Sequence, residues 1–441
     1  MISDDLHKFT NSINRVLSVQ NRGSSGSKLV HALVDNHPNV LAIPSLYMMY
    51  FFLQFWPENI DRNKKSVLEE FFLSHKYWFD PKGYAPWGTD RMGLNGDESA
   101  YVEKRIFTKN LHIVLGNNEK VNRKLFFQSL YVAYSLSIGR KLDLNPEEYI
   151  MIFPHHSNSV QTAIELTKDF PETFFLHLFR EPIQSLGSSC KLYLKRGVTI
   201  ERYRRYTIAT YGFYILLRDK FRVSKEQYKI YSYSPILHEY GPSSRGVRLE
   251  DLVDAPKKTL LKVCEWVGIP WSDELLKATY NGKTWWNRPE SARVTGLSKI
   301  PLSRTHADLF TKYDKYRLNI LFSEINKQMG YKSIKWKATL INKIILLLSL
   351  LFPFKLEMLC IFPSKFSLQF NFNEIVNEII NKRTLRVSKL RYARIAINKT
   401  KKLFIVWILL IPIQGYIECR IALFSAYNKL INGDYDVVKI L

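Results

Sequence analysis

A short apolar run, a loop of small residues and a helical pattern follow one another in VLSVQNRGSSGSKLVHALVDNHPNV, residues 16–40. Residues 13–19 predict a strand, residues 28–35 predict a helix with an apolar face, and residues 40–43 predict a second short strand. A strand that enters a helix through glycine and serine brings loop N–H groups and the positive helix end to one point. The stretch therefore predicts an α/β unit with an anion cradle at the start of the helix.

The alternation of strands and helices continues through the first 330 residues. The pattern predicts strands at residues 149–153, 173–179 and 247–249, and a mostly helical segment at residues 111–140. It also predicts helices at residues 159–169 and 256–267, with another helix beginning after Pro182. Such alternation is typical of an α/β fold with a mainly parallel sheet.

Composition narrows the class of protein further. The chain has 441 residues, of which 46% are hydrophobic and 14% aromatic, which argues against general disorder. Its formal net charge of +24 favours anionic partners such as nucleotides, acidic sugars, nucleic acid or anionic lipid. The four cysteines stand at neither metal-ligand nor disulfide-framework spacing, which favours a reducing compartment. The first residues, MISDDLHKF, predict neither a signal peptide nor an N-terminal membrane anchor.

The residues of the predicted cradle are suited to binding an anion, but they do not match the sequence pattern of the loop that binds ATP. Gly26 lets the backbone approach a ligand closely, and Arg22 and Lys28 add positive charge. The ATP-type pattern is G-x-x-x-x-G-K-[ST]. If Gly26 is its second glycine, Asn21 takes the place of the first and Ser27 takes the place of the lysine. A phosphate-binding loop of the kinase type is therefore the weaker interpretation.

The stretch instead resembles the phosphosulfate-binding loop of sulfotransferases that use 3′-phosphoadenosine 5′-phosphosulfate (PAPS). That family often reads [RK]-S-G-[TS]-[TKS]-x-L and then D-x-H-P-x-[VI], which residues 25–28 and 35–40 match. Ser24 stands where the family has its basic residue, so either Lys28 or Arg22 could contact the bridging oxygen. The resemblance implies a set of donor-binding residues in this loop: Arg22, Ser24, Ser25, Gly26, Ser27 and Lys28.

A second stretch, FPETFFLHLFREPIQSLGSSCKLYL at residues 170–194, resembles the other signature of the same family. The resemblance implies that Arg180, at the end of a strand, and Ser188, in the following helix, bind the 3′-phosphate of the nucleotide. An arginine fork suits phosphate oxygens on chemical grounds as well. The alternative is a structural pair of Arg180 with Glu181 at a strand-to-helix turn.

A third resemblance concerns the segment NGKTWWNR, residues 281–288. It lies where sulfotransferases close a basic loop over the nucleotide, which implies a role in donor binding for Lys283, Trp285 and Arg288. The alternative is an aromatic turn on the surface. The resemblance covers residues 10–330, and we expect the P-loop-like sulfotransferase fold there, an α/β fold with a parallel sheet flanked by helices.

The acceptor of a sulfuryl group must lose a proton, and a histidine suits that task because its pKa lies near neutrality. In MIFPHHSNS, Pro154 and His156 match the P-x-H segment of many sulfotransferases. His156 is our first candidate for the base and His155 the second, and Lys28 is expected to stabilise the leaving oxygen. The alternative for each histidine is a purely structural role. Ser45 stands where some carbohydrate sulfotransferases have a glutamate base.

Residues 331–441 differ from the rest of the chain and are predicted to form a basic, mostly helical C-terminal extension. They contain 18 Lys and Arg against 6 Asp and Glu. Two apolar runs, residues 344–354 and 403–413, are shorter than the ~20 residues that span a bilayer. The extension either packs on the catalytic domain or docks on an anionic membrane surface through residues 340–424.

These observations together predict a PAPS-dependent sulfotransferase with a catalytic domain at residues 1–330. The predicted acceptor is a hydroxyl or amine of a carbohydrate, a phenolic compound or another small or envelope molecule. We expect no metal and no nucleic-acid partner, and a cytoplasmic location with or without docking at the inner face of a membrane. Two alternatives stay open: a P-loop nucleotide kinase-like phosphotransferase, and a non-catalytic nucleotide-binding protein at a membrane surface.

Overall fold

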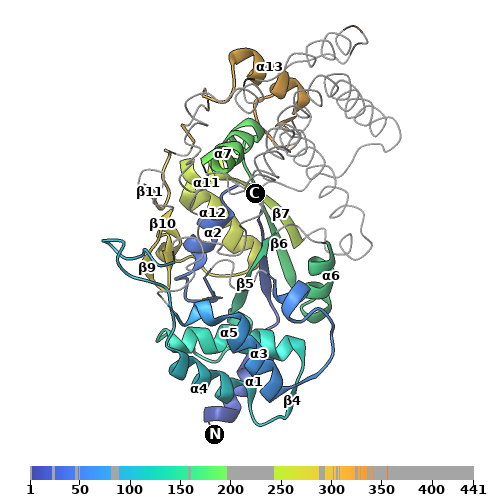
Figure 1. Cartoon of the computed structure of the whole chain (residues 1–441), viewed down its shortest axis with the longest axis vertical. Helices are drawn as coiled ribbons and strands as arrows, with labels where there is room; N and C mark the ends of the chain where they lie inside the picture. Colours follow the sequence, from blue (N-terminus) through green and yellow to red (C-terminus); the bar gives the residue numbers. More distant parts are fainter. Residues whose placement is uncertain are drawn as a thin grey trace, which may run out of the picture. The chain divides into compact units, whose positions relative to one another are not determined.

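Figure 1 shows the computed structural model of the chain. The structure describes residues 2–21, 25–44, 48, 50–80, 89–156, 160–195, 243–287, 294–300, 302–303, 306, 308–322, 326–327, 329–334, 339, 341 and 355. The chain forms two compact units. The first contains Met1–Arg180, Ile230–Arg304 and Val438–Leu441, and the second contains Glu181–Lys229 and Thr305–Val437.

A parallel sheet of five strands forms the centre of the first unit. Its strand order is β2-β5-β1-β6-β7, and every neighbouring pair is parallel. The strands are β1 Val16–Asn21, β2 Val40–Leu41, β5 Ile150–His156, β6 Thr173–Phe179 and β7 Ser244–Arg248. This sheet confirms the predicted α/β class. The strand that precedes the predicted cradle, β1, is the middle one, so the cradle follows the carboxyl end of the sheet's centre.

Helices cover both faces of this sheet. The longer helices of the first unit are α1 Ile2–Ser12, α2 Ser27–Val34, α3 Lys64–Ser74, α4 Lys104–Leu115, α5 Arg123–Ser137, α6 Val160–Asp169, α11 Leu249–Asp254 and α12 Pro256–Val267. Short helical turns lie at η1 Phe51–Phe55, η2 Lys76–Trp78, η4 Pro146–Glu148 and η6 Asp273–Leu276. Three two-residue ladders pair β3 Arg62–Asn63 with β4 Lys120–Val121, β8 Thr279–Tyr280 with β9 Lys283–Thr284, and β10 Trp286–Asn287 with β11 Val294–Thr295.

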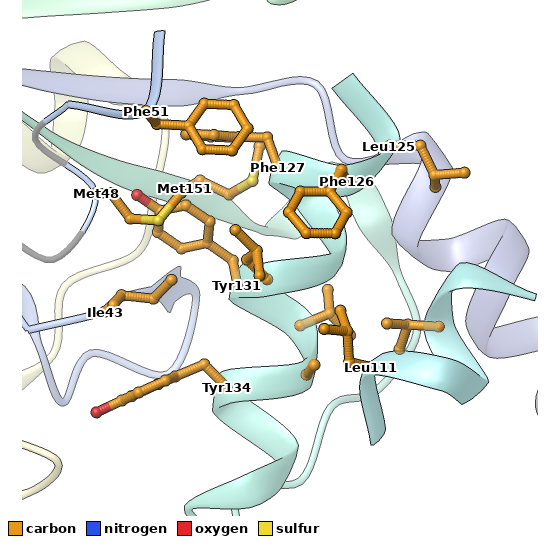
Figure 2. Packing of buried hydrophobic residues seen from close by; sticks show 14 of the residues in the cluster. Ile43, Met48, Phe51, Leu111, Leu125, Phe126, Phe127, Tyr131, Tyr134 and Met151 are labelled. Atoms are coloured by element: carbon orange, nitrogen blue, oxygen red, sulfur yellow. The ribbon is translucent and has the colours of Figure 1, made fainter. Parts of the chain in front are cut away.

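The alternation of side chains along β1 divides the apolar core in two. Val16 faces a cluster that α1, α4, α5 and η1 complete, whereas Leu17 and Val19 face a cluster completed by α2, α11 and α12. Figure 2 shows the first cluster, in which Phe127 of α5 lies near Phe51, with ring centroids 5.1 Å apart. Burial of both sheet faces explains why the strands read as nearly continuous apolar runs.

The structure confirms that residues 111–140 are mostly helical and shows how the segment is divided. Two helices occupy this region, α4 and α5, and the short strand β4 separates them. Gly116 ends α4 with a positive φ of 66°, a conformation that glycine adopts without strain. Asn122 begins α5, where its side chain accepts a hydrogen bond from the backbone N–H of Leu125 at 2.7 Å.

The second unit contributes two described helices, α7 Pro182–Lys195 and α13 Lys312–Leu321. Within it, Thr311 and Asp314 form a reciprocal capping box at the start of α13. The expectations for the basic C-terminal extension fall almost entirely outside the described residues, and the domain boundary at residue 330 stays a prediction. Among the helices that the structure describes, none is long and apolar enough to cross a membrane.

Candidate active site

The predicted anion cradle lies between β1 and α2. Gly26 immediately precedes α2 with φ 96° and ψ 5°, and a Cβ atom added there would lie 2.7 Å from Leu249 Cδ1. Glycine therefore satisfies both the left-handed backbone and the close approach of α11. Ser25 and Ser27 are 3% and 6% exposed, and Lys28 is half-buried in the first turn of the helix. Arg22 and Ser24 lie outside the described residues.

Hydrogen bonds connect both ends of α2 to the β8–β9 hairpin. At its start, the Tyr280 hydroxyl donates to the carbonyl oxygen of Lys28 at 3.3 Å. Just after its end, the carboxylate of Asp35 accepts hydrogen bonds from Thr279 Oγ1 at 3.1 Å and from the Gly282 N–H at 3.2 Å. Burial raises the pKa of Asp35 to about 6, against the lowering effect of these hydrogen bonds. The hairpin thus holds the helix whose first turn forms the cradle.

The segment predicted to close over the nucleotide continues from this hairpin. Lys283 Nζ donates to the carbonyl oxygen of Ser99 at 3.2 Å and pairs with the Glu98 carboxylate at 3.0 Å. Trp285 is 3% exposed and packs in the cluster on the α2 face of the sheet. Arg288 lies outside the described residues. The role of all three in donor binding stays a prediction.

The two candidate bases end β5 beside the central strand. In the sheet register, His155 is opposite Gln20 and His156 is opposite Asn21. His155 is 0% exposed, and its Nδ1 lies 3.0 Å from Gln20 Nε2. The structure describes the backbone of His156 but not its side chain. Both residues are therefore placed at the carboxyl edge of the sheet, the edge at which α/β proteins bind ligands.

The predicted 3′-phosphate residues fall in different units. Arg180 directly follows β6 in the first unit and is 8% exposed. Ser188 lies on α7 in the second unit, where its Oγ is 3.4 Å from His306 Nε2. Also in the second unit, the Glu181 side chain caps α7 by accepting from the backbone N–H groups of Ile183 and Gln184. A joint role of Arg180 and Ser188 at a phosphate stays a prediction.

Two residues, one in each unit, were not anticipated from the sequence. Gln20 is an inward-facing polar residue near the end of a buried strand, which is the one sequence signal that could have marked it. His306 lies against Gly187, whose added Cβ would be 2.6 Å from the imidazole ring, and it carries no comparable signal because 118 residues separate it from Ser188.

Comparison with known families decides the class of this site. The profile of the sulfotransferase family matches residues 23–273, which is more than half of the chain and includes both the cradle and β5. The chain belongs to the sulfotransferase family. The matched segment of this sulfotransferase also includes Arg180 and Ser188, and it ends before Lys283. The family membership that the loop and strand motifs predicted is confirmed.

Solved structures that are similar to this chain include three that are themselves described as sulfotransferases. The sulfotransferase domain from the curacin biosynthetic pathway is 12% identical, with 73% of this chain and 99% of that chain covered and a TM-score of 0.38. The sulfotransferase domain of the Synechococcus PCC 7002 olefin synthase is 15% identical, with 73% and 96% covered and a TM-score of 0.39. Sulfotransferase STF1 from Mycobacterium tuberculosis H37Rv is 16% identical, with 62% and 74% covered and a TM-score of 0.28. Among curated protein sequences, none matches.

Proposed function

We propose that this sulfotransferase transfers a sulfuryl group from PAPS to a hydroxyl or amine of an acceptor, and that the acceptor is a carbohydrate or another small or envelope molecule. The observation that carries the proposal is the cradle itself. Gly26 adopts a left-handed conformation between the central strand and the first turn of α2, within the segment that the family profile matches.

The chemistry of the cradle fits the phosphosulfate end of this donor. Its groups are serine hydroxyls, the Lys28 ammonium and the N–H groups at a helix start, all of which favour an anion. When bound, PAPS supplies the sulfuryl group that is transferred. In the proposal, Ser25, Ser27 and the backbone around Gly26 hold the phosphosulfate, while Arg180 and Ser188 hold the 3′-phosphate.

The proposed transfer needs two further actions from the protein. The base, His156 or His155, takes the proton of the attacking hydroxyl or amine, and Lys28 stabilises the negative charge that develops on the leaving oxygen. Because sulfuryl transfer resembles phosphoryl transfer, positioning and cationic stabilisation are expected to supply most of the acceleration. Metal ions and nucleic acid have no part in the proposal, and among the described residues no cluster of three His, Cys, Asp or Glu is placed to bind a metal.

The net charge of +24 supports an anionic acceptor or surface. We extend the proposal to a cytoplasmic location in which residues 340–424 dock on an anionic membrane. The same charge would concentrate an acidic sugar at the protein. Binding to an anionic membrane and binding of the acceptor therefore need separate experiments.

Calorimetry with 3′-phosphoadenosine 5′-phosphate, the nucleotide product, tests the donor. We expect it to bind wild type more tightly than ATP with magnesium, and Arg180→Ala to weaken its binding about 10- to 100-fold, as the loss of charge-assisted hydrogen bonds predicts. Arg105→Ala is the matched control, because that side chain is 89% exposed and far along the chain from the motifs. Preference for ATP, or equal affinity in the Arg180 and wild-type proteins, would overturn the assignment.

A further inference from the structure

A row of three polar side chains crosses the middle of the sheet beneath its carboxyl edge. The buried polar row consists of His155 on β5, Gln20 on β1 and His177 on β6, which are register partners on adjacent strands. All three residues are buried, with exposures of at most 1%. Burying a polar group raises the free energy of the folded state unless the group is hydrogen-bonded. The hydrogen-bond partners of each imidazole in the row therefore determine which of its ring nitrogens carries a proton.

Two contacts of the Gln20 amide nitrogen lie within the described part of the chain. Gln20 Nε2 donates to Ser18 Oγ at 2.9 Å, and it lies 3.0 Å from His155 Nδ1. Ser18 is two residues earlier on β1, so its side chain is on the same face of the sheet. An amide NH₂ group carries two hydrogens, and these two contacts use one each.

The second contact restricts the protonation of His155. An N–H donor is satisfied only by an unprotonated ring nitrogen, so Nδ1 must present its lone pair to Gln20. A neutral imidazole then carries its single proton on Nε2. The other histidine of the row, His177, places its Nε2 3.0 Å from Ser244 Oγ on β7.

From this geometry we infer that Gln20 is a positioning residue that holds His155 as the Nε2–H tautomer. In that form His155 is a hydrogen-bond donor and has no lone pair left to take a proton from the acceptor. The base is then His156, at the next position of β5. The tautomer rests on the orientation of the Gln20 amide, with its nitrogen toward His155, whereas the assignment of the base rests on the proposed function.

Nitrogen-15 NMR of the full-length protein with labelled histidine tests the tautomer without any ligand. At about pH 8.5, where an ordinary imidazole is neutral, we expect a protonated Nε2 and an unprotonated Nδ1 for His155. A His155→Gln variant, which lacks the signal, assigns it among the ten histidines. A protonated Nδ1 in wild type would mean that the amide oxygen faces the ring, and it would overturn the inference.

Two substitutions show whether Gln20 sets the tautomer. A carboxylate only accepts, so Gln20→Glu is expected to move the His155 proton to Nδ1, while Gln20→Met, which keeps the volume, is expected to leave a mixture of tautomers. The Met variant decides the question if the buried glutamate prevents folding. The His7 signal is the internal control and should not change, because that ring contacts the carbonyl oxygen of Val114 on α4 and does not belong to the row. A His155 spectrum that is the same in the Met variant and in wild type would overturn the role of Gln20.

Turnover distinguishes this inference from the function on which part of it depends. His156→Gln is expected to lower kcat at least 100-fold with little change in nucleotide affinity, as the loss of a general base predicts. His155→Gln, which retains a hydrogen-bond donor, is expected to lose less than tenfold. The reverse order would overturn the assignment of the base. Absence of any sulfuryl transfer would overturn the proposed function, while the NMR result on the tautomer would stand.

Discussion

Gly26 is the residue on which the shape of the cradle depends, because it combines a left-handed backbone with contact to Leu249. Gly26→Ala is expected to lower the free energy of unfolding by about 1–3 kcal/mol and to weaken the binding of 3′-phosphoadenosine 5′-phosphate. Urea unfolding and calorimetry measure the two effects. Gly96→Ala is the control, since Gly96 has a similar φ of 71° but no atom within 4 Å of an added Cβ. Unchanged stability and affinity in the Gly26 variant would contradict the close contact.

Asp35 makes the stability of the protein depend on pH in an unusual direction. Its pKa is raised by burial from 3.8 in the reference state to about 6 in the folded protein. The folded state therefore favours the protonated carboxyl, and the stabilisation is complete below pH ~4 and lost as the pH rises through ~6.

Asp35→Asn tests this dependence, because an amide keeps an acceptor oxygen for Thr279 and Gly282 but does not ionise. Relative to wild type, the variant is expected to gain about 2–3 kcal/mol of unfolding free energy between pH 4 and pH 7. The difference between the two proteins is the quantity to measure, since other groups titrate in both. A constant difference across this range would show that Asp35 is already ionised at low pH.

At the scale of elements, α5 packs the core on one sheet face. Phe127 is fully buried and touches the rings of Phe51, Phe52 and Phe153. Phe127→Ala is expected to cost about 3–5 kcal/mol in a urea unfolding experiment, from lost burial and the cavity left behind. Leu73→Ala on α3 is the comparison, because that side chain is 73% exposed and should change stability by less than about 0.5 kcal/mol. Equal effects of the two substitutions would contradict the packing of α5.

The sequence predicted those elements whose signal is local. The aromatic and aliphatic run at residues 173–179 became β6 with the same bounds, and the glycine–serine loop before α2 marked the cradle. Residues 111–140 are mostly helical as predicted, but the position of the break was not predicted, because Gly116 adopts a positive φ that the apolar periodicity does not register. The pairing of Gln20 with His155 depends on strand order and register across 135 residues, which a single sequence does not contain.

At the scale of the whole molecule, buried histidines are expected to make the fold sensitive to acid. Burial lowers the pKa of His31 and of His75 to about 4 each. Since the unfolded chain takes up these protons near pH 6.5, stability is present above that pH and is lost as the pH falls toward 4.

His75→Phe separates this effect from the titration of carboxylates. His75 stacks on Phe71 with ring centroids 4.5 Å apart, so phenylalanine retains the packing and removes the titration. Between pH 7 and pH 5, the variant is expected to lose about 2 kcal/mol less of its unfolding free energy than wild type. Identical pH profiles for the two proteins would show that His75 is protonated without unfolding.

The place of β1 in the middle of the sheet also has a consequence for the order of events during synthesis. Its two neighbours, β5 and β6, begin at Ile150 and Thr173, more than a hundred residues later in the chain. Parallel strands so distant in sequence pair late, because a long loop must close before any contact is gained. The cradle residues leave the ribosome early, but the strand that carries them gains its first neighbour only with β5 and its second only with β6. A nascent chain that ends before residue 179 therefore lacks the complete central sheet on which the proposed donor site depends.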